Sequence, residues 1–127
     1  MSTLKVNTIQ NTSGGSSSTP EQIEQGRAKS WVNFNMSSVS IRDSFNISSI
    51  TDSGTGFYGI NLSNAHSNAN YCIVASGSHD AGVYLAHPYV RDRGDVTITA
   101  SFFQINGYNS ADSNTDIKDT FVATFGD

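Results

Sequence analysis

Alternation of apolar and polar residues in the stretch from Ala28 to Leu62 constrains the fold more than any other feature of this sequence. From Val32 to Met36 every second residue is apolar and the two between them are Asn. Successive side chains of a β-strand point to opposite faces, so this period of two is typical of a half-buried strand. The pattern places Trp31, the single Trp of the chain, on the polar face of that strand.

The same stretch also predicts a bulge and a hairpin. Ile50 is out of phase with the apolar positions up to Ile47. A slip of one residue would turn every side chain to the other face, so we expect a bulge or bend near Ser48 and Ser49. Residues 52–56 read Asp-Ser-Gly-Thr-Gly, and the two Gly can adopt the positive φ angles of a hairpin loop.

Later segments predict further strands. Residues 71–75 are apolar on both faces, as in a central strand. Residues 83–90 contain Pro88, which cannot donate to a ladder and therefore predicts an edge strand. Alternation at 96–102 and an apolar pattern at 121–125 indicate two more strands.

This pattern predicts an all-β antiparallel sandwich, or a jelly-roll-like domain, over residues 28–127. It gives about seven to nine short strands separated by turns. The chain has 127 residues, of which 36% are hydrophobic and 14% charged. The core is therefore thin and the surface polar but weakly charged. We expect such a domain to share its core with copies of itself.

Residues 1–27 have a different character. Leu4, Val6 and Ile9 make a short, mostly alternating extended segment, and residues 11–19 form a linker rich in Ser and Gly. An isolated strand leaves its backbone groups unpaired and is not stable alone. We expect this strand either to fold back on its own sheet or to pair with another subunit or another protein.

A helix is predicted between the linker and the sheet. Thr19 is a good cap, Pro20 suits the first helical position, and Gln22 completes a capping box. The helix should run to about Gln25, with Ile23 as its one buried side chain. The alternative is an extended linker with a local turn.

Charge and hydropathy argue against two classes of partner. The chain carries 7 Lys and Arg against 11 Asp and Glu, a net charge of −4, so a nucleic-acid partner is not expected. No apolar run reaches the roughly 18–20 residues of a membrane span, and the start lacks the apolar core of a signal peptide. We expect that the protein is made in a cytoplasm and does not insert into a membrane. Cys72 is the single Cys and should be a small buried hydrophobic residue.

The residues that could carry chemistry are sparse. His66, His79 and His87 lack metal-site spacing and are expected to be solvated loop residues. Residues 112–116 resemble the start of an EF-hand loop, but the later ligand positions are wrong, which leaves either a solvated loop or a loop cation of another geometry. A Ser–His–Asp triad can be neither assigned nor excluded. We expect no enzymatic activity and no cofactor.

Tyrosines near predicted loops are candidates for recognition. An exposed Tyr presents a flat apolar face with a polar tip, which suits sugars and protein surfaces. Tyr84, Tyr89 and Tyr108 are the candidates for binding a host-surface glycan, and Tyr58 lies beside a loop as well. The alternative for all of them is packing in the core or between the sheets.

Three segments resemble virion structural proteins of tailed phages, especially tail-fibre-like proteins of phages that infect cyanobacteria. The segments are Ser-Thr-Leu-Lys-Val-Asn-Thr-Ile-Gln at 2–10, Trp-Val-Asn-Phe-Asn at 31–35 and Ile-Arg-Asp-Ser-Phe-Asn-Ile-Ser-Ser-Ile-Thr-Asp at 41–52. The run Tyr-Cys-Ile-Val at 71–74 is similar too. The resemblance is good over about a third of the chain and loose in the C-terminal half. A connection after Asn35 that is short and lacks Gly departs from it.

The resemblance implies a non-enzymatic, β-rich, homotrimeric protein located in the virion. It implies that residues 1–27, through Leu4, Val6 and Ile9, attach to tail or capsid proteins. It also implies that the later loops face a host receptor. A decoration or adaptor protein without receptor binding is the alternative, and a small glycan-active enzyme is a more remote one.

Overall fold

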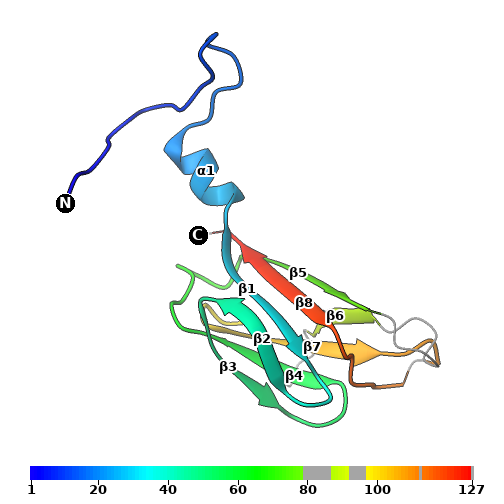
Figure 1. Cartoon of the computed structure of the whole chain (residues 1–127). Coiled ribbons are helices and arrows are strands. Elements are labelled where there is room, and N and C mark those ends of the chain that lie inside the picture. The colour runs from blue at the N-terminus through cyan, green and yellow to red at the C-terminus, as the bar shows by residue number, and fades with distance from the viewer. Residues whose placement is uncertain (79–86, 92–96, 112, 127) are drawn as a thin grey trace.

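The chain forms two antiparallel sheets that pack as a sandwich (Figure 1). The computed structural model describes residues 1–78, 87–91, 97–111 and 113–126. The elements in chain order are α1 (Pro20–Gly26), β1 (Ala28–Asn35), β2 (Ser40–Phe45), β3 (Ile47–Asp52), β4 (Phe57–Leu62), β5 (Cys72–Gly77), β6 (His87–Arg91), β7 (Phe102–Tyr108) and β8 (Thr120–Phe125). The strand order is β2-β1-β8-β5 in one sheet and β3-β4-β7-β6 in the other. The predicted all-β antiparallel sandwich is confirmed.

Strand β1 is buried on one face as predicted. Val32 and Phe34 are buried, and so is Met36 directly after the strand, whereas Trp31 is exposed. β1 pairs with β2 on one side and with β8 on the other, so it is a central strand of its sheet. Its inner side chains therefore pack on the opposite sheet. The buried apolar residues of the core are Val32, Phe34, Met36, Tyr58, Ile60, Leu62, Tyr71, Phe103, Ile105, Ile117 and Val122.

The predicted bulge and hairpin are confirmed. The register between β3 and β4 shifts between Ile47 and Ser49. In the loop that joins them, Gly54 has a φ of 114° and Gly56 a φ of 75°. A Cβ at Gly56 would lie 2.7 Å from the carbonyl oxygen of Gly107, so both φ and space require glycine there.

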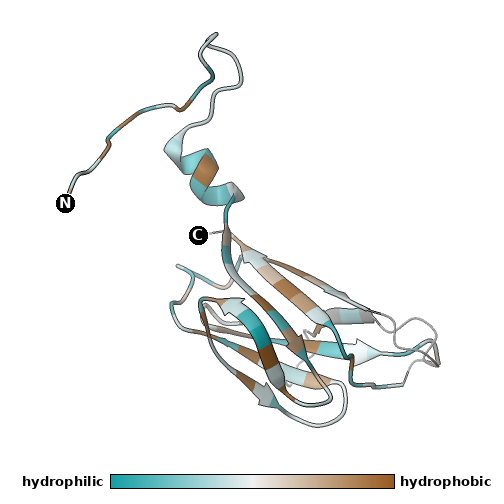
Figure 2. Ribbon diagram, viewed as in Figure 1, coloured by the Kyte–Doolittle hydropathy of each residue, from teal (hydrophilic) through white to brown (hydrophobic). Residues whose placement is uncertain are grey.

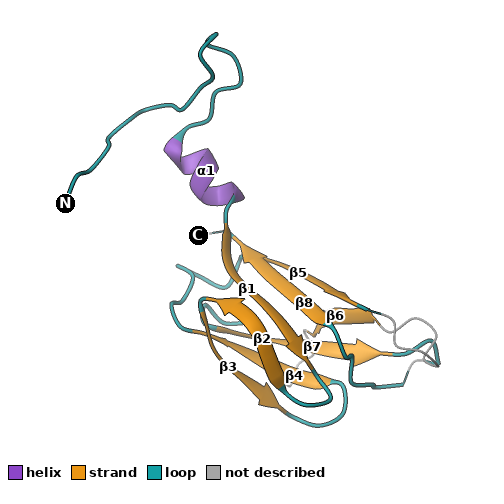
Figure 3. Ribbon diagram, viewed as in Figure 1, coloured by secondary structure: helices purple, strands orange, loops and turns teal. Residues whose placement is uncertain are grey.

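Helix α1 forms as predicted, but it buries nothing. The Thr19 side chain accepts from the Gln22 backbone N–H, and the Gln22 side chain accepts from the Thr19 N–H, which makes a complete capping box. The prediction that Ile23 is buried is wrong, because this side chain is 43% exposed. The helix extends away from the sheets (Figure 3), and none of its residues is buried.

The N-terminal segment is irregular. The predicted strand over residues 4–9 does not form, and only Ile9 makes a β-bridge, to Ser18, with both N···O distances at 2.8 Å. The linker doubles back and pairs with this one residue, so the residues before it have no partner strand. Within the described residues, no ladder joins this segment to either sheet. We call residues 1–19 the arm.

Two strand predictions are wrong. The segment at 71–75 is not a central strand, because β5 is the edge of its sheet and Cys72 is exposed. Alternate residues of β5 are exposed, because they lie on the outer face of the sheet. The expected strand at 96–102 starts too early, because Thr99 and Phe102 close a tight turn and β7 begins at Phe102.

The prediction that Pro88 marks an edge strand is confirmed. Among the described residues, β6 is the last strand of its sheet and pairs only with β7. Pro88 lies opposite Gly107 and is buried. Among the described residues, no helix has the length and apolar character needed to cross a membrane.

Candidate interaction surfaces

The outer face of the sheet β2-β1-β8-β5 carries large apolar side chains. Figure 2 shows hydrophobic residues on the strands of this sheet. Inner positions such as Val32 and Val122 are buried, so their neighbours along the strand point outward. Outward apolar residues and their exposed fractions are Trp31 (37%), Phe45 (53%), Val74 (52%) and Phe121 (44%). We call this surface the Trp31 face.

The side chains of the Trp31 face lie in rows across the strands. Phe45 is opposite Trp31, Trp31 is opposite Ala123, and Ala123 is opposite Val74, so one row crosses all four strands. Phe121 lies in the next row. Between these rows is a shallow groove of ≈ 360 Å³ whose lining is mostly apolar.

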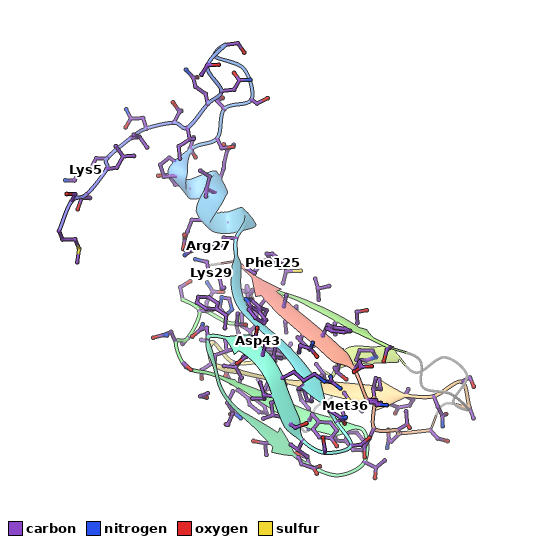
Figure 4. All side chains as sticks on the ribbon, viewed as in Figure 1. Lys5, Arg27, Lys29, Met36, Asp43 and Phe125 are labelled. Carbon is purple, nitrogen blue, oxygen red and sulfur yellow. The ribbon has the colours of Figure 1, made fainter. Side chains whose placement is uncertain are left out.

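Charged and polar groups lie on the edge of this face. The guanidinium of Arg42 lies 2.6 Å from Asp119 Oδ1 and donates to Asn33 Oδ1 at 3.0 Å and to the Lys118 carbonyl at 2.9 Å. Asp43 is exposed beside it on β2 (Figure 4). The Trp31 face thus has an apolar centre and a polar edge, which is the usual arrangement of a protein–protein interface.

A cleft of ≈ 470 Å³ lies near one end of this face, where α1 meets the sheet. Figure 4 places Arg27 and Lys29 at this junction. Both cations contact the carboxylate of Glu24, Arg27 at 2.9 Å. The hydrogen bond from Lys29 is the main cause that lowers the pKa of Glu24 below its usual value. Phe45, Asn46 and residues 63–66 complete the lining.

Asn46 holds the wall of this cleft together. It has a φ of 58°, in the left-handed region. Its amide NH₂ donates to the carbonyls of Lys29 and Asn64, and its Oδ1 accepts from the Asn64 N–H at 2.7 Å. The amide is therefore used for structure. The exposed ring of Phe45 and the cations Arg27 and Lys29, both paired with Glu24, are the groups that a ligand such as a sugar could contact.

His66 is a structural residue, and the prediction that it is solvated is wrong. Its ring stacks on Tyr71 with centroids 4.0 Å apart and an interplanar angle of 8°. Its Nε2 is 3.0 Å from Thr124 Oγ1. Tyr71 donates its hydroxyl to the Thr99 carbonyl at 2.9 Å, and burial raises the pKa of Tyr71 to about 12. The bulk of the stacked rings keeps solvent from His66.

The tyrosine candidates differ in environment. Tyr84 lies outside the described residues, and so does the side chain of Tyr89, whose backbone pairs with Asn106. Tyr108 is partly buried at the end of β7. Tyr58 belongs to the core, where its hydroxyl donates to the Met36 carbonyl at 2.7 Å. For Tyr84, Tyr89 and Tyr108 a role in binding stays a prediction. Tyr58 packs in the core, as the alternative for these tyrosines predicted.

The loop considered for a cation uses one carboxylate for structure. Asp116 Oδ1 accepts from the Gly56 N–H at 2.7 Å and lies 3.0 Å from the Tyr58 hydroxyl. Asp112 lies outside the described residues. His79 does too, and the side chain of His87 is not described. In the part of the chain that is described, no cluster of His, Cys, Asp or Glu could hold a metal ion.

The arm and α1 form the remaining apolar surface. Leu4 is 84% exposed and Ile9 53%, and Val6 is exposed as well. Together with Ile23 and Pro20 of the helix they line an open groove of ≈ 590 Å³. The structure therefore brings the predicted docking residues beside the helix and leaves them accessible.

The Trp31 face is not predicted from the sequence. The one signal that points to it is alternation, which places the large aromatic side chain of Trp31 among polar neighbours on the solvent face. Comparison with known proteins adds no assignment, because no family model, no curated protein and no solved structure matches this chain.

Proposed function

We propose that this protein is a non-enzymatic structural subunit of a tailed-phage virion, a small tail fibre or appendage. It assembles as a homotrimer and attaches to tail or capsid proteins through residues 1–27. The observation that carries the proposal is the arm, whose apolar side chains at Leu4, Val6 and Ile9 stay accessible next to α1. The resemblance of residues 2–10 and 31–52 to phage fibre proteins supplies the virion context and the lack of catalysis.

The energetics of the arm favour docking on another protein. Fully burying a Leu, Val or Ile side chain gains about 1.5–3 kcal/mol. Leu4, Val6 and Ile9 do not contribute this free energy to the sandwich, because their side chains are exposed to solvent. The Ser- and Gly-rich linker at 11–19 is flexible, so residues 4–9 of the arm can reach a partner surface. A partner that covers Leu4, Val6 and Ile9 would therefore order the arm on binding.

The second part of the proposal is recognition of a host-surface glycan. The cleft where Phe45 lies beside Arg27 and Lys29 supports it. Tyr84, Tyr89 and Tyr108 are its further candidate residues, proposed from the sequence. A decoration or adaptor protein would share the arm but would not bind cells. Binding of the purified protein to host cells, with Arg27→Ser as a variant in the cleft, separates these two roles.

Incorporation into particles tests the docking role. Changing Leu4, Val6 and Ile9 together to Ser should abolish incorporation in an infected host and leave the thermal unfolding of the sandwich unchanged. Thr3→Ser with Asn7→Ser is the matched control, because it alters the same segment without removing apolar surface. Normal incorporation of the triple variant would overturn the docking role.

A further inference from the structure

We propose that the Trp31 face is the surface through which one copy of this chain packs against further copies of itself. In the homotrimer of the proposed function, on which this inference rests, three copies turn this face toward the common axis. Trp31 and Phe121 then lie at the centre of the contact, and the paired charges of Arg42 lie at its edge.

The size of the apolar surface supports an interface. Three aromatic side chains, Trp31, Phe45 and Phe121, are each exposed over a third to a half of their surface. Since a large aromatic side chain carries about 150–250 Å², these rings offer roughly 250–300 Å² of apolar area. This area is at the lower end of the largest apolar patch on a typical monomer, about 300–600 Å², which is often the functional one.

The shape of the face favours another copy of the chain over a narrow partner. Four strands spaced about 4.8 Å apart and about 20 Å long give roughly 400 Å² of flat area. A standard interface uses about 800 Å² of accessible surface from each partner, so the whole face must be covered. In a trimer each copy contacts two others, which together can cover this face. The arm of the same chain brings only a few apolar side chains, such as Leu4 and Val6, and extends away from the sheet (Figure 1).

The charges also favour self-association. Around a symmetry axis each side chain near the axis meets its own copies, so a charge there would be repelled. β5 and β8 carry no charged residue, and β1 carries only Lys29, which is paired with Glu24 near the cleft. Arg42 is paired with Asp119 at the edge. The exposed Asp43 lies on the outermost strand, β2, at the outer end of the row that holds Asn33 and Phe121.

Trp31 supplies a direct readout because it is the single Trp of the chain. In the associated state its ring is excluded from water, and on dissociation it is exposed as in the isolated chain. Diluting the full-length protein from 100 µM to below 1 µM should therefore shift the Trp31 emission to longer wavelength and raise its quenching by acrylamide. Sedimentation equilibrium across the same range should give a trimer mass that falls with dilution.

Variants identify the surface. Val74→Lys and Phe121→Ser should each weaken association by about tenfold or more and should therefore move the dilution shift of Trp31 to higher protein concentration. Ser49→Lys is the matched control for Val74→Lys, because it adds the same charge to the exposed edge strand β3 of the other sheet. Circular dichroism and thermal unfolding check that each variant is folded. Leu4→Ser with Val6→Ser tests whether the arm covers the face instead.

Three results would overturn the inference. If the wild-type protein stays monomeric at 100 µM, both the proposed homotrimer and the role of the Trp31 face in it are wrong. If the wild-type protein is a trimer and Val74→Lys and Phe121→Ser associate equally well, the role of the Trp31 face is wrong but the trimer stands. Loss of association in the arm variant with no effect of the face variants assigns the contact to the arm. None of these results decides attachment to the virion, which the particle incorporation experiment tests separately.

Discussion

The arm and the sandwich use apolar residues in opposite ways. In the sandwich, Phe34 and Ile60 are fully buried between the sheets. In the arm, Leu4 and Ile9 are as apolar and yet remain in solvent. The sandwich residues therefore stabilise the fold, whereas the arm residues contribute nothing to it and are free to stabilise a complex. Chemical similarity of residues is a poor guide to their role unless burial is known.

The largest expected effect is loss of a core aromatic ring. Phe34→Ala should lower the free energy of unfolding by about 3–5 kcal/mol, because the deletion leaves a cavity beside Tyr58, whose ring centroid is 5.9 Å away. Ile9→Ala in the arm should change it by less than about 0.5 kcal/mol. Urea unfolding followed by Trp31 fluorescence measures both. A comparable loss in Ile9→Ala would mean that the arm is part of the folding unit.

Glycines give the next contrast. A Cβ at Gly107 would lie 2.3 Å from the carbonyl oxygen of Thr115, so Gly107→Ala should destabilise the sandwich by about 1–3 kcal/mol. At Gly26, the last residue of α1, nothing lies within 4 Å of that position. Gly26→Ala should leave the sandwich transition unchanged and raise helix content slightly. Equal destabilisation by both changes would contradict the separation of the two regions.

Alkaline pH should affect the sandwich but not the arm. The folded-state pKa of Tyr71 is about 12, above its ordinary value near 10. The neutral hydroxyl is favoured in the fold, so this contribution to stability is complete below about pH 10 and is lost as the pH rises toward 12. Burial and the nearby Asp116 also raise the pKa of Tyr58. Tyr71→Phe should reduce the loss of stability over this range, as measured by urea unfolding at successive pH values.

The smallest expected effect on the sandwich comes from the helix cap. Thr19→Ala removes one half of the capping box and should cost α1 about 1 kcal/mol of local stability. Because α1 buries no side chain, the global unfolding transition should stay where it is. Amide hydrogen exchange should show faster exchange in the helix alone. Faster exchange in β1 as well would mean that α1 and β1 unfold together.

Local chemistry made some elements predictable from the sequence. The capping box at Thr19, the paired glycines at 54 and 56, and the edge position of Pro88 each depend on neighbouring residues, and all three were predicted correctly. The alternation that ends at Met36 likewise gave the inner face of β1.

Tertiary context decided what could not be predicted. On β8 the apolar positions Phe121 and Ala123 point outward, while the small polar Thr120 and Thr124 are buried. Thr124 can be buried because Ser30 lies 2.7 Å away and satisfies its hydroxyl. That partner is distant in sequence, so periodicity alone assigns the wrong face. The Trp31 face was missed for this reason.

The direct connection between α1 and β1 has a mechanical consequence. Arg27 alone separates the helix from a strand that is hydrogen-bonded along both sides, to β2 and to β8. A pull transmitted through an attached arm would act along the length of β1. It would load both ladders in shear, many hydrogen bonds at once, and would not open them one by one as at a free edge. If the arm attaches to another protein as proposed, the pulling force enters the sandwich at a strand that is paired on both sides.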